Sequence, residues 1–188
     1  MALDPDAELM LRVKEGDEAS FALLLDKHRS SVIHFLYRMV QNRAISEELA
    51  QEVFLRVYRS RETYEATAKF TTWLFRISTH VALNWLRDRK SERSQESLDE
   101  EGDGKHARHV PDRSPLVEQR MVAEVKAEEI RRAVAALPDK QRAAVVMHKY
   151  EEMEYAQIAA VLSCSESAVK SLLFRAYETL RARLSHMA

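Results

Sequence analysis

Apolar residues recur at intervals of three and four along most of the chain, in segments separated by short polar breaks. This spacing places apolar side chains on one face of an α-helix. It predicts a short leading helix that ends at Gly16-Asp17, followed by a longer second helix. The apolar face of the second helix comprises Phe21, Leu24, Leu25, His28, Val32, Phe35, Leu36 and Met39. With only three glycines and four prolines in 188 residues, the pattern indicates an all-α protein.

Two further helices are predicted in the N-terminal half. Ser46 is placed as the N-cap of the third helix, because Glu47 and Glu48 would then lie in its first turn, where the helix dipole favours acids. The apolar stripe of this helix comprises Leu49, Val53, Phe54 and Val57. The stretch 61–69 interrupts the stripe and predicts a loop, after which Phe70 opens a fourth helix.

The apolar periodicity is lost between residues 91 and 114, where two of the three glycines stand among many charged residues. Such a segment buries too little apolar surface to offset the entropy cost of ordering it. We therefore predict a flexible acidic linker over residues 91–114. It joins two small helical domains, residues 5–90 and residues 115–186.

The C-terminal domain is predicted to contain four helices. They span residues 117–136, a segment from Pro138 to about Tyr150, residues 155–162, and a segment that ends near Leu184. Pro138 suits the first helical position because its missing N–H group is not needed there. The last two helices are separated only by Ser163-Cys164-Ser165, with Ser165 as the N-cap, which is the pattern of a helix-turn-helix.

The helix-turn-helix has one face for packing and one for solvent. The predicted packing contacts join Ile158, Ala159 and Leu162 to Val169, Leu172, Leu173 and Ala176. The opposite face carries Lys170, Ser171 and Arg175, which can donate hydrogen bonds to bases and phosphates in a major groove. An ordinary helical hairpin with solvated charges fits the same periodicity, so both interpretations stay open at this point.

The net charge of −1 hides two blocks of opposite sign. Residues 69–90 contain five basic residues and one aspartate, whereas residues 92–103 contain six acids and one arginine. Trp73, Phe75 and Trp85 lie among the basic residues, a mixture suited to stacking on unpaired bases and holding phosphates. The helical spacing of Trp73 favours a core position for that residue instead.

Catalytic and metal-binding chemistry finds little support in the sequence. The acids of the third helix lack a histidine at metal-ligand spacing, and His106 and His109 lie in the predicted linker. Cys164 is the single cysteine, which excludes an internal disulfide. We therefore expect no enzyme activity, metal or cofactor. The chain has no apolar run long enough to span a bilayer and no N-terminal signal pattern, so we expect a cytoplasmic protein without membrane insertion.

Four stretches together resemble an extracytoplasmic-function (ECF) sigma factor of bacterial RNA polymerase, over nearly the whole chain. Residues 15–38 are similar to the first helix of sigma region 2, and residues 44–59 to its polymerase-clamp-binding helix. Residues 70–90 are similar to the part that melts the promoter and reads its −10 element. Residues 137–184 are similar to region 4. The resemblance implies a factor that binds core RNA polymerase, directs it to a promoter class and helps to open the duplex.

The resemblance also implies site residues. The core-polymerase contact would involve Glu48, Gln51, Glu52 and Arg56. The −10 contact would involve Tyr64, Lys69, Phe70, His80, Asn84 and Arg87. The −35 contact would involve Lys170, Ser171, Phe174 and Arg175. The implied partners are core RNA polymerase, promoter DNA and an anti-sigma factor.

The chain departs from the family pattern at Ala66, His80 and Leu172, and this bears on which bases it would read. Two other classes of protein remain open. A freestanding helix-turn-helix repressor would need a dimerisation or ligand-binding domain, which fits the clamp-like helix and the acidic linker poorly. A sigma-like decoy would bind polymerase without reading DNA.

Overall fold

A computed structural model describes residues 4–96 and 115–187, all of them in helices, turns or loops without a strand. The helices of the first half are α1 (Pro5–Lys14), α2 (Glu18–Val40), α3 (Arg43–Arg59), the short 3₁₀ helix η1 (Arg61–Thr63) and α4 (Phe70–Glu96). Those of the second half are α5 (Pro115–Ala135), α6 (Asp139–Tyr150), α7 (Tyr155–Leu162), α8 (Glu166–Arg183) and the 3₁₀ helix η2 (Ser185–Met187). The all-α prediction is confirmed.

The helix ends in the first half follow local capping chemistry, with one correction. Asp17 caps α2 by accepting hydrogen bonds from the backbone N–H groups of Ala19 and Ser20. The N-cap of α3 is Asn42, whose side chain accepts from the Ile45 N–H at 3.0 Å, so the prediction of Ser46 was wrong. Ser46 is buried inside α3, and its hydroxyl donates to the Arg43 carbonyl at 2.7 Å. The helix therefore starts one turn earlier than the acidic pair suggested.

The second half matches its predicted boundaries closely. Pro138 lies at the N-cap position of α6, one residue before the first helical position at which it was predicted. Ser165 caps α8 as predicted, with its hydroxyl accepting from the Ala168 N–H at 3.1 Å. Helix α4 continues to Glu96, beyond the predicted start of the linker, and the rest of that predicted linker, residues 97–114, lies outside the described residues.

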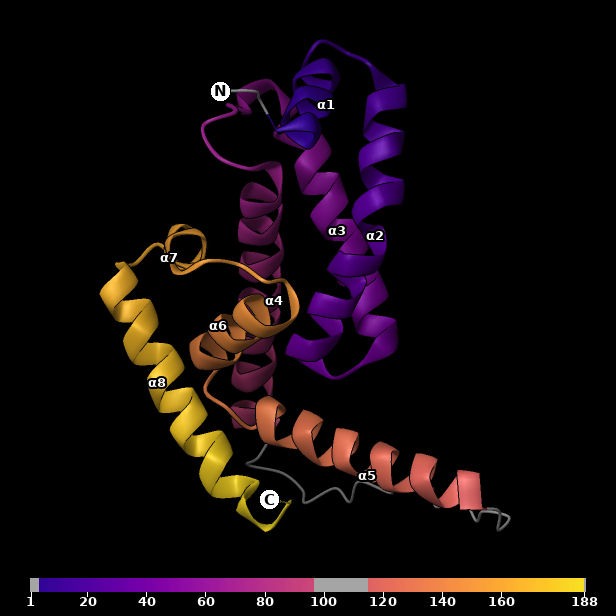
Figure 1. Ribbon diagram of the computed structural model, residues 1–188. Coiled ribbons are helices and arrows are strands. Elements are labelled where there is room, and N and C mark those ends of the chain that lie inside the picture. The colour runs from indigo at the N-terminus through magenta and orange to yellow at the C-terminus, as the bar shows by residue number, and fades with distance from the viewer. Residues whose placement is uncertain (1–3, 97–114, 188) are drawn as a thin grey trace.

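Helices α1 to α4 enclose one part of the apolar core. In Figure 1, α2, α3 and α4 run roughly side by side, and α1 lies at one end of them. Fully buried side chains from α2, α3 and α4 meet in this core, namely Leu24, Val32, Phe35, Leu36, Met39, Val53, Val57, Phe70 and Leu74. The Phe35 and Phe75 rings meet edge-on with their centroids 5.3 Å apart, a favourable geometry for aromatic pairs.

Helices α6, α7 and α8 form the predicted helix-turn-helix unit. Ile158 and Ala159 of α7 are buried, as are Val169, Leu173 and Ala176 of α8, in agreement with the predicted packing. The predicted contacts Leu162 and Leu172 are only partly buried, while Val161, which the periodicity did not single out, is fully buried. The turn begins at Ser163 in a left-handed conformation with φ of 52°, which lets α8 cross α7 after three residues.

The two helical units pack against each other rather than lying apart. Figure 1 shows α6 and α7 against the α2–α4 side of the molecule, with α8 on the outside. The Gln157 side chain of α7 donates to the Thr72 hydroxyl of α4 at 3.4 Å, and Lys90 of α4 pairs with Asp139 of α6 at 2.6 Å. The Arg38 guanidinium of α2 lies 4.0 Å from the centre of the Tyr150 ring of α6, a cation–π contact.

A buried arginine joins the units at their centre. Arg142 of α6 is only 8% exposed. Its guanidinium donates to the carbonyl of Met39 in the last turn of α2, and to the carbonyls of Ala135 and Leu137 at the end of α5. These acceptors lie where helices leave carbonyl groups unpaired and where the helix dipole favours a cation. Burial lowers the pKa of Arg142, and the Asp139 carboxylate opposes that shift.

We expect Arg142→Met to loosen this closed arrangement. The substitution keeps an apolar stem of similar length, but the buried carbonyls of Met39 and Leu137 lose their donor. Each unsatisfied buried acceptor costs about 1–3 kcal/mol. The variant should therefore melt at a lower temperature and give a larger radius of gyration by small-angle X-ray scattering. Lys149→Met is the matched control, because it removes an exposed cation from the same helix. If both variants matched the wild type in melting temperature and radius, the role of Arg142 would be disproved.

Candidate functional site

The outward face of α3 carries the residues predicted to bind core polymerase. Glu48, Gln51 and Arg56 are exposed, and Glu52 is partly exposed. Glu52 and Arg56 form an i,i+4 ion pair with Arg56 Nε 2.7 Å from Glu52 Oε1. The pair fixes two long side chains in one orientation on the surface, although such an exposed pair adds little to stability. The structure thus places all four residues on the solvent side of α3, as predicted.

An apolar groove lies beside this face, between α2 and α3. Its apolar lining comprises Phe21, Leu25, Ala50, Phe54, Leu55 and Tyr58, and its polar rim comprises Glu18, Arg29, Glu47 and Gln51. Leu55 is half exposed, and the Phe21 and Tyr58 rings meet edge-on at 5.1 Å. The sequence reasoning missed this groove. The available signal was Leu55, a leucine that stands among the polar outward positions of α3.

Four of the six residues predicted to contact the −10 element are exposed. His80, Asn84 and Arg87 follow one another at intervals of four and three along α4, and therefore share one face. His80 lines a shallow depression at the junction of α3 and α4, whose other lining residues are Arg56, Arg59, Ser60 and Ile77. Lys69 is exposed in the loop that precedes α4. This surface combines cations with hydrogen-bonding groups, which suits the backbone and bases of a nucleic-acid strand.

The other two predicted −10 residues, Tyr64 and Phe70, are core residues, and their prediction as surface contacts was wrong. Tyr64 is 2% exposed and Phe70 is fully buried. Their rings form an aromatic cluster with Trp73 and His28, in which the Tyr64 and Trp73 centroids are 4.8 Å apart. Burial, together with the nearby Asp4 carboxylate, raises the pKa of Tyr64 to about 12. Burial of aromatic rings of this size removes a large apolar area from water, and this favours core positions for both side chains.

The four residues predicted for the −35 contact gather on the outer face of α8. Lys170, Ser171, Phe174 and Arg175 are all exposed and line one shallow depression. Phe174 is 68% exposed, which is unusual for a large apolar side chain on a helix whose other face is packed. Ser167, which the sequence reasoning missed, lines the same depression, and its carbonyl accepts from the Ser171 hydroxyl at 3.1 Å.

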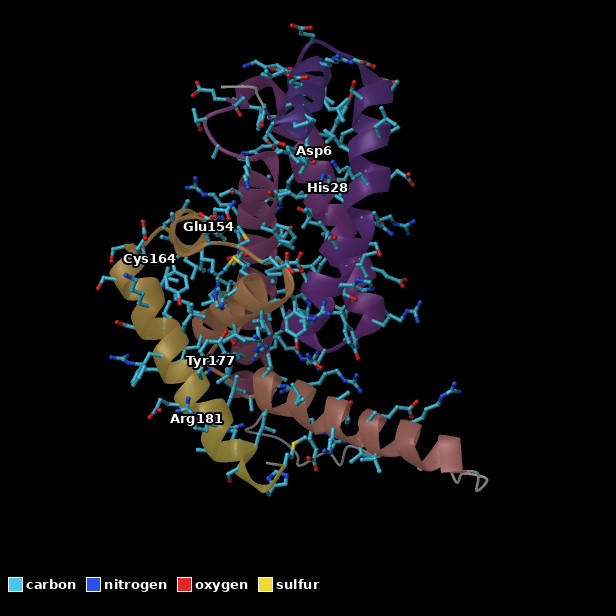
Figure 2. All side chains as sticks on the ribbon, in the orientation of Figure 1. Asp6, His28, Glu154, Cys164, Tyr177 and Arg181 are labelled. Atoms are coloured by element: carbon cyan, nitrogen blue, oxygen red, sulfur yellow. The ribbon has the colours of Figure 1, made fainter. Side chains whose placement is uncertain are left out.

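The buried side of α8 is fixed to α6 and α7 by an aromatic and polar contact. The Tyr177 hydroxyl lies 3.0 Å from His148 Nδ1, and the His148 ring packs on Tyr155 at 5.4 Å between centroids. Figure 2 shows Tyr177 on the inner side of α8, and Cys164 at the turn before this helix. Burial raises the pKa of Tyr177. These contacts hold the outer face of α8 in a fixed orientation.

Neither a metal site nor a membrane span emerges from the part of the chain that the structure describes. Within residues 4–96 and 115–187, no group of three or more His, Cys, Asp or Glu side chains is placed to hold a metal ion. Among the same residues, no helix combines the length and the apolar character needed to cross a bilayer.

Comparison with known proteins identifies both halves of the chain. Residues 24–92 match the family profile of sigma-70 region 2, and residues 127–180 match that of sigma-70 region 4. The ECF RNA polymerase sigma factor SigW of Bacillus subtilis is 30% identical over 92% of this chain and 93% of its own length. The chain belongs to the ECF sigma factor family. It is therefore a transcription initiation factor that acts with RNA polymerase in a promoter-specific manner.

Solved structures agree with this sigma factor in fold. CnrH, in complex with the cytosolic domain of CnrY, matches with a TM-score of 0.70 at 20% identity, over 98% of this chain and 100% of CnrH. RpoE of Bartonella quintana, in complex with the anti-sigma factor NepR, matches with a TM-score of 0.66 at 19% identity, over 88% and 96% of the two chains. The predicted fold of two helical domains is thereby confirmed.

We expect Tyr64→Phe to leave this sigma factor at least as stable as the wild type. The buried Tyr64 hydroxyl has no hydrogen-bond partner among the described residues, so its removal relieves a desolvation cost. Tyr64→Ala, by contrast, should cost about 3–5 kcal/mol because it leaves a large cavity in the aromatic cluster. Thermal melting of the two variants tests this. A marked loss of stability in Tyr64→Phe would show that the hydroxyl does have a partner.

Proposed function

We propose that this sigma factor binds core polymerase through α3, contacts the −10 element through α4 and reads the −35 element through α8. The observation that carries the proposal is the outer face of α8, where two cations, a hydroxyl and an exposed Phe174 share one depression opposite a packed apolar stripe. A solvated helix needs no exposed phenylalanine, whereas a groove-binding helix can place one against a thymine methyl group. By its membership of a non-catalytic family, the chain acts as a regulator and not as an enzyme, in the cytoplasm where the polymerase works.

The polymerase contact combines polar and apolar parts. The Glu52–Arg56 pair and Glu48 supply charges of both signs, while the neighbouring groove offers Leu55 and Phe54 as an apolar centre. A buried apolar centre with a polar rim is the usual composition of a stable protein interface. We therefore assign the affinity mainly to the groove, and the orientation of the partner mainly to the charged face of α3.

The −10 contact is assigned to the exposed residues alone. His80, Asn84 and Arg87 lie along α4 and can follow a strand for about two helical turns. Lys69 adds a cation at the start of this helix. The side chains of His80 and Asn84 can hydrogen-bond a base edge, and the cations can hold phosphates. In this assignment α4 contacts a single-stranded segment of DNA. In an intact duplex, the base edges that His80 and Asn84 would hydrogen-bond are not accessible to the flat side of a helix bundle.

Simultaneous contact with both promoter elements requires the domains to separate. By their nominal positions, the −10 and −35 elements are centred about 25 base pairs apart, which corresponds to about 85 Å of duplex at about 3.4 Å per base pair. A compact chain of this length has a radius of gyration of about 16 Å and a diameter of about 40 Å. The closed arrangement, with α7 on α4, is too short to span the distance. We therefore assign this arrangement to the factor before it binds the promoter.

An anti-sigma partner would act on the equilibrium between the closed arrangement and one in which the two domains are separated. RpoE of B. quintana, which shares this fold, was solved with the anti-sigma factor NepR. We propose that the present factor also has an inhibitor that contacts both helical units and stabilises their closed packing. Such a partner need not cover the proposed DNA-contacting residues, because holding α4 and α8 close together is enough to prevent binding to both promoter elements.

We expect Glu52→Lys to weaken the binding of core polymerase about tenfold or more. The change reverses one charge and places two cations one turn apart on the proposed contact face, while an exposed position costs the fold little. Glu178→Lys is the matched control, because Glu178 is also an exposed helical glutamate in an ion pair, with Arg181 at 3.0 Å. Affinity is measured without DNA. Equal affinities for wild type and Glu52→Lys would remove α3 from the contact.

We expect Arg175→Ala and Lys170→Ala to affect −35 binding differently. The planar arginine fork can bind guanine in a bidentate manner, whereas lysine is a mobile point charge suited to phosphate. Arg175→Ala should cost about 1–3 kcal/mol and flatten the preference at one or two −35 positions. Lys170→Ala should weaken binding evenly across sequences and reduce the salt slope by about one counterion.

The control for both variants is Arg181→Ala, which removes an exposed, ion-paired arginine from the same helix. Binding is measured across single-base −35 changes at several salt concentrations. Uniform loss in Arg175→Ala would make Arg175 a phosphate contact. No loss in either variant would favour a decoy that binds polymerase without reading DNA.

A further inference from the structure

Both ends of the loop before α4 are tied to the same short helix, α1. At the start of the loop, the Lys14 ammonium donates to the backbone carbonyl of Tyr64 at 2.9 Å. At its end, the backbone N–H of Phe70 donates to Asp4 Oδ2 at 2.8 Å. Figure 1 shows the N-terminal end of α1 beside this loop, at the end of the molecule away from α5 and α8.

The Asp4 contact is a helix cap made across the fold. Asp4 stands at the N-cap position of α1, but its side chain makes no capping hydrogen bond to that helix. Its carboxylate instead accepts from the first residue of α4, 66 positions along the chain. The first N–H groups of a helix have no partner within it, and the helix dipole favours an anion there. Asp4 thereby fixes the point at which the loop becomes helix.

The Lys14 contact lies at the other end of α1. Lys14 is the last residue of this ten-residue helix, so about 15 Å of rigid helix separates it from Asp4. The side chain is exposed, yet the ammonium reaches a partly buried backbone carbonyl, a bond strengthened by its charge. The two loop ends are therefore held at opposite ends of one rigid element.

Helix α1 is itself held firmly on the domain. Ala7, Met10 and Val13 are buried against the core, and the buried Asp6 carboxylate accepts from Lys27 at 2.6 Å and lies 2.9 Å from His28 Nε2. Figure 2 shows Asp6 and His28 facing each other between α1 and α2. Burial alone would raise the pKa of Asp6, but the hydrogen bonds from Lys27 and His28 outweigh it and lower that pKa below its usual range. A displacement of α1 would have to break these contacts.

Any contact between the loop 65–69 and DNA would depend on the shape of the loop's backbone. Because Tyr64 and Phe70 are buried, neither aromatic ring is free to stack on a base. Glu65, Thr67 and Lys69 are the exposed polar residues of the loop, and the Thr67 N–H donates to the Glu65 carbonyl at 2.9 Å. Where the side chains and backbone groups of a loop must meet a base, a small change in loop shape changes which base fits.

We propose that α1 sets the base preference at the −10 side of the promoter by holding the loop 65–69 in one shape, with Asp4 and Lys14 as positioning residues. The proposal deepens the function assigned to α4 and rests on it. Neither residue touches DNA in this account. Loss of either tie leaves the loop anchored by η1 and α4 but free to adopt several shapes, so discrimination between bases falls more than binding does.

The experiment is transcription in vitro by core RNA polymerase with full-length sigma factor, from templates randomised upstream of the start site. Sequencing the transcribed templates gives the base preference at every position, so the promoter sequence need not be known beforehand. Lys14→Met removes the donor but keeps the apolar stem, and Lys14→Arg keeps a donor. Asp4→Ala removes the other tie. Lys27→Met is the control, since it removes an α1–α2 contact that does not touch the loop.

We expect Lys14→Met and Asp4→Ala to flatten the preference at the −10 side about three- to tenfold, the equivalent of one hydrogen bond. The base preference at the −35 side should stay the same as in the wild type in every variant. Lys27→Met and Lys14→Arg should also keep the wild-type preference at the −10 side. An unchanged −10 profile in both loop variants, with clear wild-type preference, would overturn the role of α1 alone. Equal flattening in Lys27→Met would overturn the assignment of this role to Asp4 and Lys14, because general loosening of α1 would then suffice. A wild-type factor without any −10 preference would overturn the proposed function as well.

Discussion

The packing of the two helical units depends on where one buried charge finds its hydrogen-bond acceptors. A guanidinium taken out of water is costly unless its donors are satisfied. The terminal nitrogens of Arg142 donate to the carbonyls of Met39, Ala135 and Leu137, at the ends of two helices whose last carbonyl groups need donors in turn. Its buried Nε has no partner among the described residues. Because Ala135 and Leu137 lie in the second unit and Met39 lies in the first, only the bond to Met39 requires the units to be closed. The other polar contacts between the units are weaker, since Lys90 is largely exposed and the Gln157–Thr72 bond is long.

Helix α4 contributes to several parts of the structure at once. Its buried side carries Leu74, Ser78 and Val81, another part of its surface meets α7 through Thr72, and His80 and Asn84 remain exposed. One helix thus contributes to a core, an interface between units and a candidate DNA surface. The face of α4 that carries His80 and Asn84 therefore stays exposed while α7 is docked on another part of the helix. The length of α4, 27 residues, gives room for all three.

The structural features that were predicted correctly depend on residues close together in the sequence. The features that were missed depend on contacts between residues far apart in the sequence. Helical periodicity located α7, α8 and their turn, and Ser165 was recognised as a cap because capping involves residues three positions apart. The family resemblance implied Tyr64 and Phe70 as DNA contacts, but both are buried, and their burial depends on Trp73 together with His28 from another helix. The cap of α4 could not be found from its own neighbourhood, because it comes from the start of α1. The role of Arg142 has the same origin, since its acceptor Met39 lies 103 residues away.

Closure of the units and contact with a promoter are linked by a simple energetic condition. A partner shifts an equilibrium between two forms only by the difference in its affinity for them. Under the proposed function, promoter DNA that meets α4 and α8 at once would bind only the open form. The free energy of that binding would then have to exceed the cost of exposing Arg142 and the apolar surface between α4 and α7. A polymerase that binds the α3 face alone would have equal affinity for both forms, because this face lies on the solvent side of the first unit whether or not α7 is docked. Polymerase binding at α3 therefore cannot open the factor by itself. Opening needs further contacts that exist only in the separated form, either to the second unit or to DNA.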